Sequence, residues 1–409
     1  MANVFNFTGK IVLGKDSDKF HPIERKEFAS SWMNTTVKFN CVSGTNRVLC
    51  TTQGGKWKDD KKNVVKTFGK STTDANGNVI KGTAIEIPWT KRFDKDQIDK
   101  VAGFKKFVVD TGDYKMRYKL QNLVTAFEKG TVTDEMMAET EIDNLEDAKA
   151  ALEKSQAKKK EFVAEWDFAE YMIKVAQSDK MKDRLFNISG TYEVSYNADK
   201  DRFYTNYHVN RVTLAAEDAE PKTEMKIDFY YGEGAWDDST YDKTGKCFVN
   251  GWVDYYDSNL KKTGFKPTTI VVREEDDKKR KGFKRKFVCD DEIKQIGLTL
   301  SVIEGTEFIE LTMDMLDDET REDIECGLLD WEEVKRELGS KTAGDRVSEL
   351  RFTELTPKKN KPQDTVYSVD DMHPAREEIV EDTNVEVEIE IEVANEEVVI
   401  DLFDDDDDL

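Results

Sequence analysis

Short segments with the composition of β-strands fill the first 110 residues, and this pattern constrains the fold more than any other feature. The segments are rich in Val, Ile, Thr and Phe, and clusters of Gly, Asn and Asp separate them. Asn76-Gly77 in one cluster is a hairpin-turn signal. Many short strands joined by turns predict a small β-barrel or β-sandwich. The expected strands lie near 3–14, 34–43, 47–52, 64–68, 78–88 and 105–110.

The spacing of apolar residues changes between 133 and 184. Leu145, Ala148 and Leu152 follow a helical period, and Asn144 before them suits an N-cap. We therefore expect a helical connector here. Beyond it the strand pattern returns, with one more helix expected near 317–338. The later strands are expected near 185–194, 202–214, 223–231, 247–256, 266–274, 283–290, 296–303, 306–313 and 346–355.

Two segments open in the same way. Residues 4–9 read Val-Phe-Asn-Phe-Thr-Gly, and residues 185–190 read Leu-Phe-Asn-Ile-Ser-Gly. The match indicates repeated domains, although six positions can also agree by chance. The chain is therefore predicted to be mainly β with helical insertions, in the α+β class. Its expected parts are a first barrel at 1–132, a helical connector at 133–184, a second β domain with a helix at 185–356, and a linker with an acidic tail at 357–409.

The net charge of −23 is distributed unevenly along the chain. Residues 1–130 carry +10, residues 131–367 carry −16, and residues 368–409 carry −17. The negative total argues against a nucleic-acid partner only if the charge is averaged over the whole chain. A basic head and a very acidic tail instead indicate nucleic-acid binding together with an acidic interaction segment.

Lysines and arginines alternate with aromatic residues in the basic head. Single-stranded nucleic acid needs both residue types, because cations follow the phosphates while rings stack on bases. In the plainer interpretation the rings belong to the core and the lysines surround them. Trp57 is the best candidate, since it lies in a Gly-, Lys- and Asp-rich segment that is hard to bury. The candidate residues are Lys56, Trp57, Lys58, Lys61, Lys62, Phe68, Trp89, Lys91, Arg92, Phe93, Lys105, Lys106, Tyr114, Lys115, Arg117 and Tyr118.

A second basic run covers residues 278–286, where seven of nine residues are Lys or Arg. We expect a hairpin loop that contacts phosphates. Two alternatives stay open, namely a solvated loop neutralised by the acidic residues 274–277 and a nuclear localisation signal. The candidate binding residues are Lys279, Arg280, Lys281, Phe283, Lys284 and Arg285.

The acidic tail contains two distinct patterns. Residues 385–393 alternate Val or Ile with Glu, and residues 401–409 read Asp-Leu-Phe followed by five Asp and a Leu. Repulsion between like charges predicts disorder at neutral pH. Apolar residues among acids form a short recognition peptide, unless the tail only improves solubility. The expected partner-binding residues are Leu402, Phe403, Asp404, Asp408 and Leu409.

Few residues fit metal or enzyme chemistry. Cys41, Cys50 and His21 lack a nearby fourth ligand for structural zinc. The motifs Gly-x-x-x-x-Gly-Lys-Ser/Thr, Gly-x-Ser-x-Gly and His-Glu-x-x-His are absent, and the chain has 3 His. We expect no enzyme activity, no catalytic residues, no cofactor and no bound metal. No apolar run is long enough to cross a membrane, and the first residues do not resemble a signal peptide.

The repeated strand openings, the ring-and-lysine segments and Asp404–Leu409 together resemble single-stranded-DNA-binding proteins, most closely the phage-type OB-fold members with an acidic C-terminal tail. The resemblance implies two OB-like barrels, DNA bound by a barrel, and a tail that recruits replication and recombination proteins. Two features depart from the family pattern. The tail ends in Leu409 where a Phe is usual, and the second barrel region is not basic overall.

The main hypothesis is therefore a protein that coats and protects single-stranded DNA during replication, recombination and repair, with a tail that regulates access to DNA. The alternatives are an acidic interaction protein, either a DNA mimic or an assembly chaperone, and a metal-dependent nuclease. The odd number of widely spaced cysteines, 5 in all, indicates reduced thiols and a cytoplasmic location, in the host cytoplasm for a phage-encoded protein. We expect no membrane partner. Nothing in the sequence separates DNA from RNA as the ligand.

Overall fold

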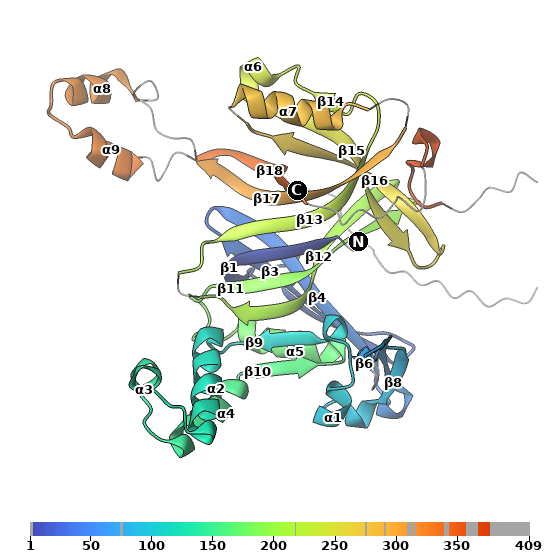
Figure 1. Ribbon diagram of the computed structural model, residues 1–409. Helices are drawn as coiled ribbons and strands as arrows, with labels where there is room; N and C mark the ends of the chain where they lie inside the picture. The colour runs from blue at the N-terminus through green and yellow to red at the C-terminus, as the bar shows by residue number, and fades with distance from the viewer. Residues whose placement is uncertain are drawn as a thin grey trace, which may run out of the picture. The chain divides into compact units, whose positions relative to one another are not determined.

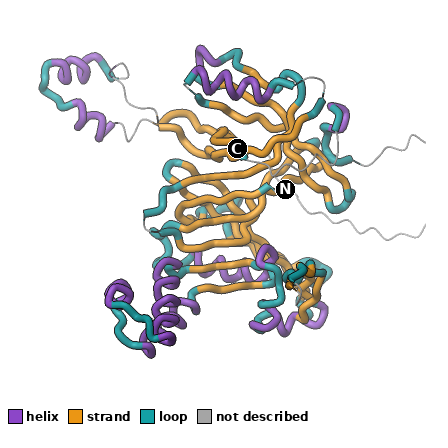
Figure 2. The backbone as a smooth tube through the Cα atoms, in the orientation of Figure 1, coloured by secondary structure: helices purple, strands orange, loops and turns teal. Residues whose placement is uncertain are grey.

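The computed structural model describes residues 3–376, apart from 74–76, 217, 275, 290–291, 309–312, 314–315, 339–342 and 357–366. Strands dominate this part of the chain, and helices lie at its periphery (Figures 1 and 2). The protein is thus mainly β with helical insertions, as expected. The acidic tail residues Leu402, Phe403, Asp404, Asp408 and Leu409 lie outside the described residues, as do 385–393.

Five strands form a first closed ring. They pair in the order β1-β3-β4-β12-β11 and back to β1. All neighbours are antiparallel except β4 and β12, which run parallel where Cys50 faces Tyr207. The strands are β1 (Val4–Leu13), β3 (Trp32–Ser43), β4 (Asn46–Trp57), β11 (Phe186–Asn197) and β12 (Arg202–Leu214).

A second closed ring repeats this connectivity. Its order is β13-β15-β16-β18-β17 and back to β13, and again the third and fifth strands along the chain, β16 and β18, are the parallel pair. The strands are β13 (Lys222–Tyr231), β15 (Cys247–Asp257), β16 (Lys262–Val272), β17 (Lys294–Phe308) and β18 (Ala343–Leu355).

The two rings also share the position of a helix in their order of elements. In each ring a helix precedes the fourth strand, namely α5 (Glu165–Ala176) before β11 and α7 (Asp277–Phe287) before β17. Phe168 and Met172 of α5 and Phe287 of α7 are buried in the main apolar core. The first strands of the two rings pair antiparallel, from Val4 facing Lys226 to Thr8 facing Lys222, which joins the rings into one sheet.

The alternation of buried and half-buried residues along the strands shows which side chains fill the interior of the rings. Val37, Phe39 and Cys41 of β3 are buried and alternate with half-buried polar residues, as a strand with one core-facing side requires. Gly9 and Gly190 allow close approaches between backbones in the first ring. A Cβ at Gly9 would lie 2.6 Å from the carbonyl oxygen of Val42, and one at Gly190 would lie 1.9 Å from that of His208.

The matching segments 4–9 and 185–190 prove to be neighbours within one ring. β1 and β11 run antiparallel with Phe7 facing Ile188, while Phe5 faces Gly190 and Gly9 faces Phe186. The interpretation of these segments as the starts of two barrels is therefore corrected, because both belong to the first ring. The repeated unit is instead the ring, and β13 takes the place of β1 in the second. Consequently, the expected boundary near residue 185 separates strands that share the first ring.

A long insertion separates β4 from β11. It contains a small sheet module at 58–105 and a helical part at 107–176, with apolar clusters around Val65 and Trp89 and around Leu120 and Leu123. The elements are η1 (Asp60–Lys62), β5 (Val64–Phe68), β6 (Thr72–Thr73), β7 (Val79–Ile80), β8 (Ala84–Pro88), η2 (Trp89–Lys91), α1 (Lys95–Ile98), η3 (Gly103–Lys105), β9 (Phe107–Asp110), α2 (Tyr114–Lys129), α3 (Asp134–Thr140), α4 (Leu145–Gln156) and β10 (Lys159–Phe162).

Other elements extend the rings, and some differ from expectation. Residues 278–286, expected as a loop next to a strand, lie in α7, which Asp276 caps. The single strand β17 covers the expected strand at 296–303 and the start of the one expected at 306–313, and the helix expected at 317–338 is two helices. The remaining elements are β2 (Ile23–Glu27), β14 (Trp236–Asp237), α6 (Tyr241–Thr244), α8 (Asp318–Glu325), α9 (Trp331–Leu338) and η5 (Val369–Asp371). Within the described ranges, no helix combines the length and apolar character that crossing a membrane requires.

Candidate nucleic-acid interface

Two tryptophans lie side by side on the outer face of the first ring. Trp32 begins β3 and Trp57 ends β4, and the hairpin register places them opposite each other. Their rings meet edge to face, with centroids 5.2 Å apart. Gly55 makes room for this pair, because a Cβ there would lie 2.1 Å from the Trp32 ring. Both rings are half-buried, so part of each aromatic surface faces solvent.

Cations surround this tryptophan pair. The Lys62 ammonium lies 5.8 Å from the Trp57 ring centroid, and Lys61 is exposed next to it. Lys58 is also exposed, and its ammonium contacts Glu27 at 2.7 Å. The Asn63 side chain fixes the turn, accepting from the Trp57 N–H at 2.7 Å and donating to the Trp57 carbonyl at 2.9 Å. The structure therefore brings together Trp57, Lys58, Lys61 and Lys62, which the sequence analysis had selected. It adds Trp32, whose contact across the hairpin no local pattern could show.

A second group of rings and cations lies where α5 meets β4. The Lys56 ammonium is 5.4 Å from the Trp166 ring centroid and 6.0 Å from that of Trp89. Trp89 is buried, and the Arg92 guanidinium covers it at 4.1 Å. Arg92 also donates to Asp167 at 2.7 Å, so its charge is used within the fold. The sequence analysis did not select Trp166, which lies in the segment expected as a helical connector.

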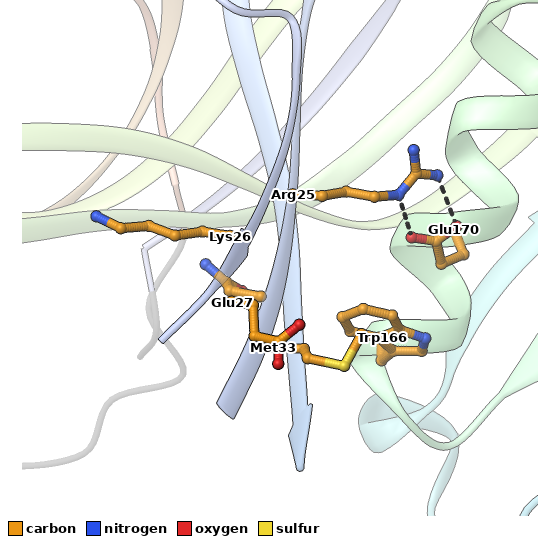
Figure 3. Close-up of a pocket in the computed structure, with 7 residues that line it drawn as sticks. Arg25, Lys26, Glu27, Met33, Trp166 and Glu170 are labelled. Carbon is orange, nitrogen blue, oxygen red and sulfur yellow. Dashed lines mark hydrogen bonds and ion pairs between the residues drawn. The ribbon is translucent and has the colours of Figure 1, made fainter. Parts of the chain in front are cut away.

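A cavity of about 410 Å³ opens beside Trp166, between the β2–β3 hairpin and α5 (Figure 3). Met33 and Trp166 supply its apolar wall, and Arg25 points toward Glu170 on α5. The Arg25 guanidinium donates to both Glu170 carboxylate oxygens, at 3.1 and 2.9 Å. The hydrogen bond from Arg25 lowers the pKa of Glu170. The Glu170 carboxylate therefore stays ionised and keeps its contact with Arg25.

The insertion carries further exposed rings, of which Phe93 adjoins the second group through Arg92. Phe68 and Phe104 pack at 6.3 Å, and 73% of Phe104 is exposed, with the Lys105 ammonium 6.0 Å from its centroid. Phe93 is exposed beneath the Arg92 guanidinium at 4.2 Å, and Lys91 is exposed next to it. These residues retain ring surface that solvent reaches, although they do not adjoin Trp32 and Trp57 in the sheet.

Helix α2, which the sequence analysis did not predict, separates its candidate residues onto two sides. Tyr114 and Tyr118 are one turn apart and exposed, and Lys115 lies 3.5 Å from Asp218. Arg117 points inward instead. It donates to both oxygens of Asp110 at 2.6 and 2.8 Å and to the Ser155 carbonyl at 3.0 Å. Burial raises the pKa of Asp110, but hydrogen bonds from Arg117 and the Gly112 N–H outweigh that and lower it.

Lys106 is likewise held inside the fold. Its side chain is 8% exposed, and its ammonium lies 2.6 Å from the Glu161 carboxylate, which Lys159 contacts from the other side at 2.6 Å. Burial alone would raise the pKa of Glu161, but the hydrogen bonds from Lys106 and Lys159 outweigh it and lower the pKa to about 2. This cluster joins β9 to β10.

We expect the free energy of unfolding of Glu161→Gln to fall less than that of the wild type as the pH is lowered. Glu161 has a depressed pKa in the folded chain, so its contribution is complete above the ordinary value of 4.5 and is lost as the pH falls toward 2. Between about pH 5 and pH 3 the wild type should lose about 1 kcal/mol through this group after solvent screening. Urea unfolding at both pH values measures the difference. An equally steep loss in the variant would assign the acid sensitivity to other carboxylates.

The basic run at 278–286 is helical, and its charges are partly paired. Arg280 and Lys281 contact Asp277, and Lys284 lies 2.7 Å from Asp238. Phe283 packs against Phe352, so neither it nor buried Phe287 offers a free ring. The expectation of a hairpin loop is corrected because the Asp276 cap and the Phe283–Phe287 spacing favour a helix. Lys279 and Arg285 are exposed on it.

The described residues contain no group of three or more His, Cys, Asp and Glu side chains placed to hold a metal ion. Cys41 and Cys50 are buried core residues, and burial raises the pKa of the Cys41 thiol to about 12. His21 instead contacts Asp16 at 2.8 Å. These three residues therefore do not form a common ligand set.

Comparisons with known proteins found little. No protein-family model matches the chain, and no curated protein matches it. Among the matching solved structures is a deletion mutant of the single-stranded DNA binding protein from Thermus aquaticus, which is 6% identical. The alignment covers 89% of this chain and 98% of that chain, with a TM-score of 0.30. Because a score this low does not establish a shared fold, the function has to be argued from the geometry of this chain.

Proposed function

We propose that this protein binds single-stranded DNA on the outer face of β3 and β4. The observation that carries the proposal is the Trp32–Trp57 pair with Lys58, Lys61 and Lys62 beside it. Rings give stacking surfaces for bases, and the lysines give counter-charges for phosphates. A duplex offers no splayed bases to such rings, so the arrangement favours a single strand.

The ring connectivity supports this assignment. We infer that both five-stranded rings are OB-like barrels, the first built from 4–57 and 186–214 and the second from 222–355. In OB folds the face of the second and third strands is the surface that binds oligonucleotides. In the first ring these strands are β3 and β4, which carry Trp32 and Trp57.

We propose further contacts for the exposed candidates of the insertion. Phe93, Phe104, Tyr114 and Tyr118 present ring surface, and Lys91, Lys105 and Lys115 are exposed next to them. They would extend the path of a bound strand beyond the barrel. Arg92, Lys106 and Arg117 would act through the fold, because their charges are engaged by Asp167, Glu161 and Asp110.

The tail completes the proposal. Residues 377–409 carry 16 acids and no Lys or Arg. Tethered to the same chain, they would compete with phosphate for the lysines at roughly millimolar effective concentration. Once DNA displaces the tail, Leu402, Phe403 and Leu409 become available to replication and recombination proteins. The tail would thus couple occupancy of the barrel to recruitment of partners.

A salt titration of DNA binding tests this function. The full chain should bind a single-stranded oligonucleotide better than the matching duplex, with a log–log salt slope of about −0.7 per neutralised phosphate. A chain ending at Arg376 should bind more tightly, most clearly at low salt. Negligible binding to both forms of DNA would reject the proposal and favour an acidic interaction protein. Equal affinities of the two chains would reject self-occlusion by the tail alone.

A further inference from the structure

An aromatic cluster lies on the outer face of the second ring, and we call its residues Tyr230, Trp252 and Phe265 the slot. Tyr230 of β13, Trp252 of β15 and Phe265 of β16 lie on the side opposite the core-facing residues Phe229 and Val253. They form an apolar cluster separate from the main core. β15 and β16 are the second and third strands of this ring, so the slot corresponds to the β3–β4 face of the first ring.

The chain itself fills this slot. We call residues 367–375 the strap. The ring of Tyr367 meets Phe265 edge to face at 5.0 Å and Tyr230 at 5.7 Å. Met372 is 8% exposed against the same cluster. An aromatic residue of the strap therefore packs edge to face against two rings of this face.

Backbone contacts hold the strap along β16. The Phe265 N–H donates to the His373 carbonyl at 2.9 Å, and the Ala375 N–H donates to the Tyr255 hydroxyl at 3.0 Å. Gly264 allows this approach, since a Cβ there would lie 2.4 Å from the Ala375 nitrogen. One backbone bond to β16 and one bond to a β15 side chain therefore fix the end of the strap on this face.

The outward side of the strap is acidic. Asp370 and Asp371 are exposed, while the ring of Tyr367 turns inward. The strap thus combines an aromatic group for the slot with anionic groups facing solvent, which are the two features of a single-stranded nucleic acid. Exposed Tyr256 and Lys261 at the end of the β15–β16 hairpin offer a further ring and a cation to such a ligand.

We propose that the slot of Tyr230, Trp252 and Phe265 is a second binding site for the bases of a single strand, and that the strap occupies it until the strand displaces it. The proposal rests on the function proposed for the first ring. A strand anchored at Trp57 presents its next bases to the slot at a high effective concentration, as the tether does for the strap. The strap therefore makes engagement of the second barrel depend on occupancy of the first.

Full-length variants that empty the slot test this regulation. Tyr367→Ala with Met372→Ala should roughly double the number of nucleotides occluded per chain at low occupancy, because a second barrel becomes available. It should also steepen the salt slope for a long strand. Val369→Ala is the matched control, since Val369 belongs to the strap but is 57% exposed. Fluorescence titration with a long homopolymer measures the occluded length, and sedimentation with circular dichroism verifies that each variant keeps the oligomeric state and the fold of the wild type.

A third substitution separates the slot from the strap. Adding Trp252→Leu to the strap variant should abolish the gain, because it removes a ring of the slot that the strand would contact. An unchanged occluded length in the strap variant would overturn the proposal while leaving binding by the first ring intact. If the wild-type chain fails to bind a short oligonucleotide, it is the proposed function that fails.

Discussion

Replacing Trp57 with Ala should weaken binding of a single-stranded oligonucleotide about ten- to a hundredfold. Removing one stacking ring typically costs about 1–3 kcal/mol, and each 1.4 kcal/mol is about a factor of ten in affinity. Trp57 is the residue where a ring, the Trp32 edge and the Lys62 ammonium meet. Equilibrium binding by fluorescence anisotropy of a labelled oligonucleotide measures the loss without relying on tryptophan emission.

Two variants make this result interpretable. Trp57→Phe keeps a ring on the β4 end and should retain most of the affinity. Trp331→Ala removes a tryptophan of α9, a helix that belongs to neither ring, and should bind as the wild type does. If Trp57→Ala binds like the wild type while its melting temperature is unchanged, bases do not stack at this face. The site would then have to lie among the exposed rings of the insertion.

Replacing Arg117 with Ala should destabilise the fold by about 3–5 kcal/mol, as expected when a buried ion pair loses one partner. The Arg117 and Asp110 side chains are 15% and 10% exposed, and the guanidinium connects α2, β9 and α4. The variant leaves the Asp110 carboxylate buried with the Gly112 N–H as its remaining neutral donor. Urea unfolding followed by circular dichroism measures the change.

A double-variant cycle distinguishes this structural role from DNA binding. Asp110→Asn combined with Arg117→Ala should recover part of the lost stability, because no buried charge is left without its partner. Lys115→Ala, on the same helix but 68% exposed, should change stability by less than about 1 kcal/mol. A stable Arg117→Ala variant with reduced affinity for single-stranded DNA would instead restore the interpretation of Arg117 as a phosphate contact.

The strands could be recognised from the sequence, but their partners could not. The alternation of Val37, Phe39 and Cys41 is local information, and it identifies β3 correctly. The parallel contact between Cys50 and Tyr207 joins residues on opposite sides of the insertion, and no short-range periodicity records it. For this reason the sequence alone assigns the similar segments at 4–9 and 185–190 to two barrels, although they are paired strands of one ring.

The candidate site was predicted only in part, because the sequence shows neighbours along the chain but not contacts between distant residues. Trp57 and its lysines are consecutive in the chain, so their combination is visible in the sequence. Trp32 reaches the site through the hairpin register, and Trp166 through the packing of α5 on Gly54. Conversely, the Lys-Met-Arg-Tyr run in α2 has the composition of a binding segment, yet the helical period turns Arg117 toward Asp110. Asp113, which caps α2, was the available signal for that helix.

The ring order also determines when this chain can fold during its synthesis. β4 ends at Trp57, and the strand that completes its ring begins at Arg202. Until the later strand emerges from the ribosome, the free edge of β4 exposes unpaired N–H and carbonyl groups that another nascent chain could pair with. Contacts so distant in sequence also slow folding, because loop-closure entropy is lost before the contact forms. The insertion helices, whose contacts are local, can form in this interval, so α5 is already folded when β11 and β12 arrive to close the ring.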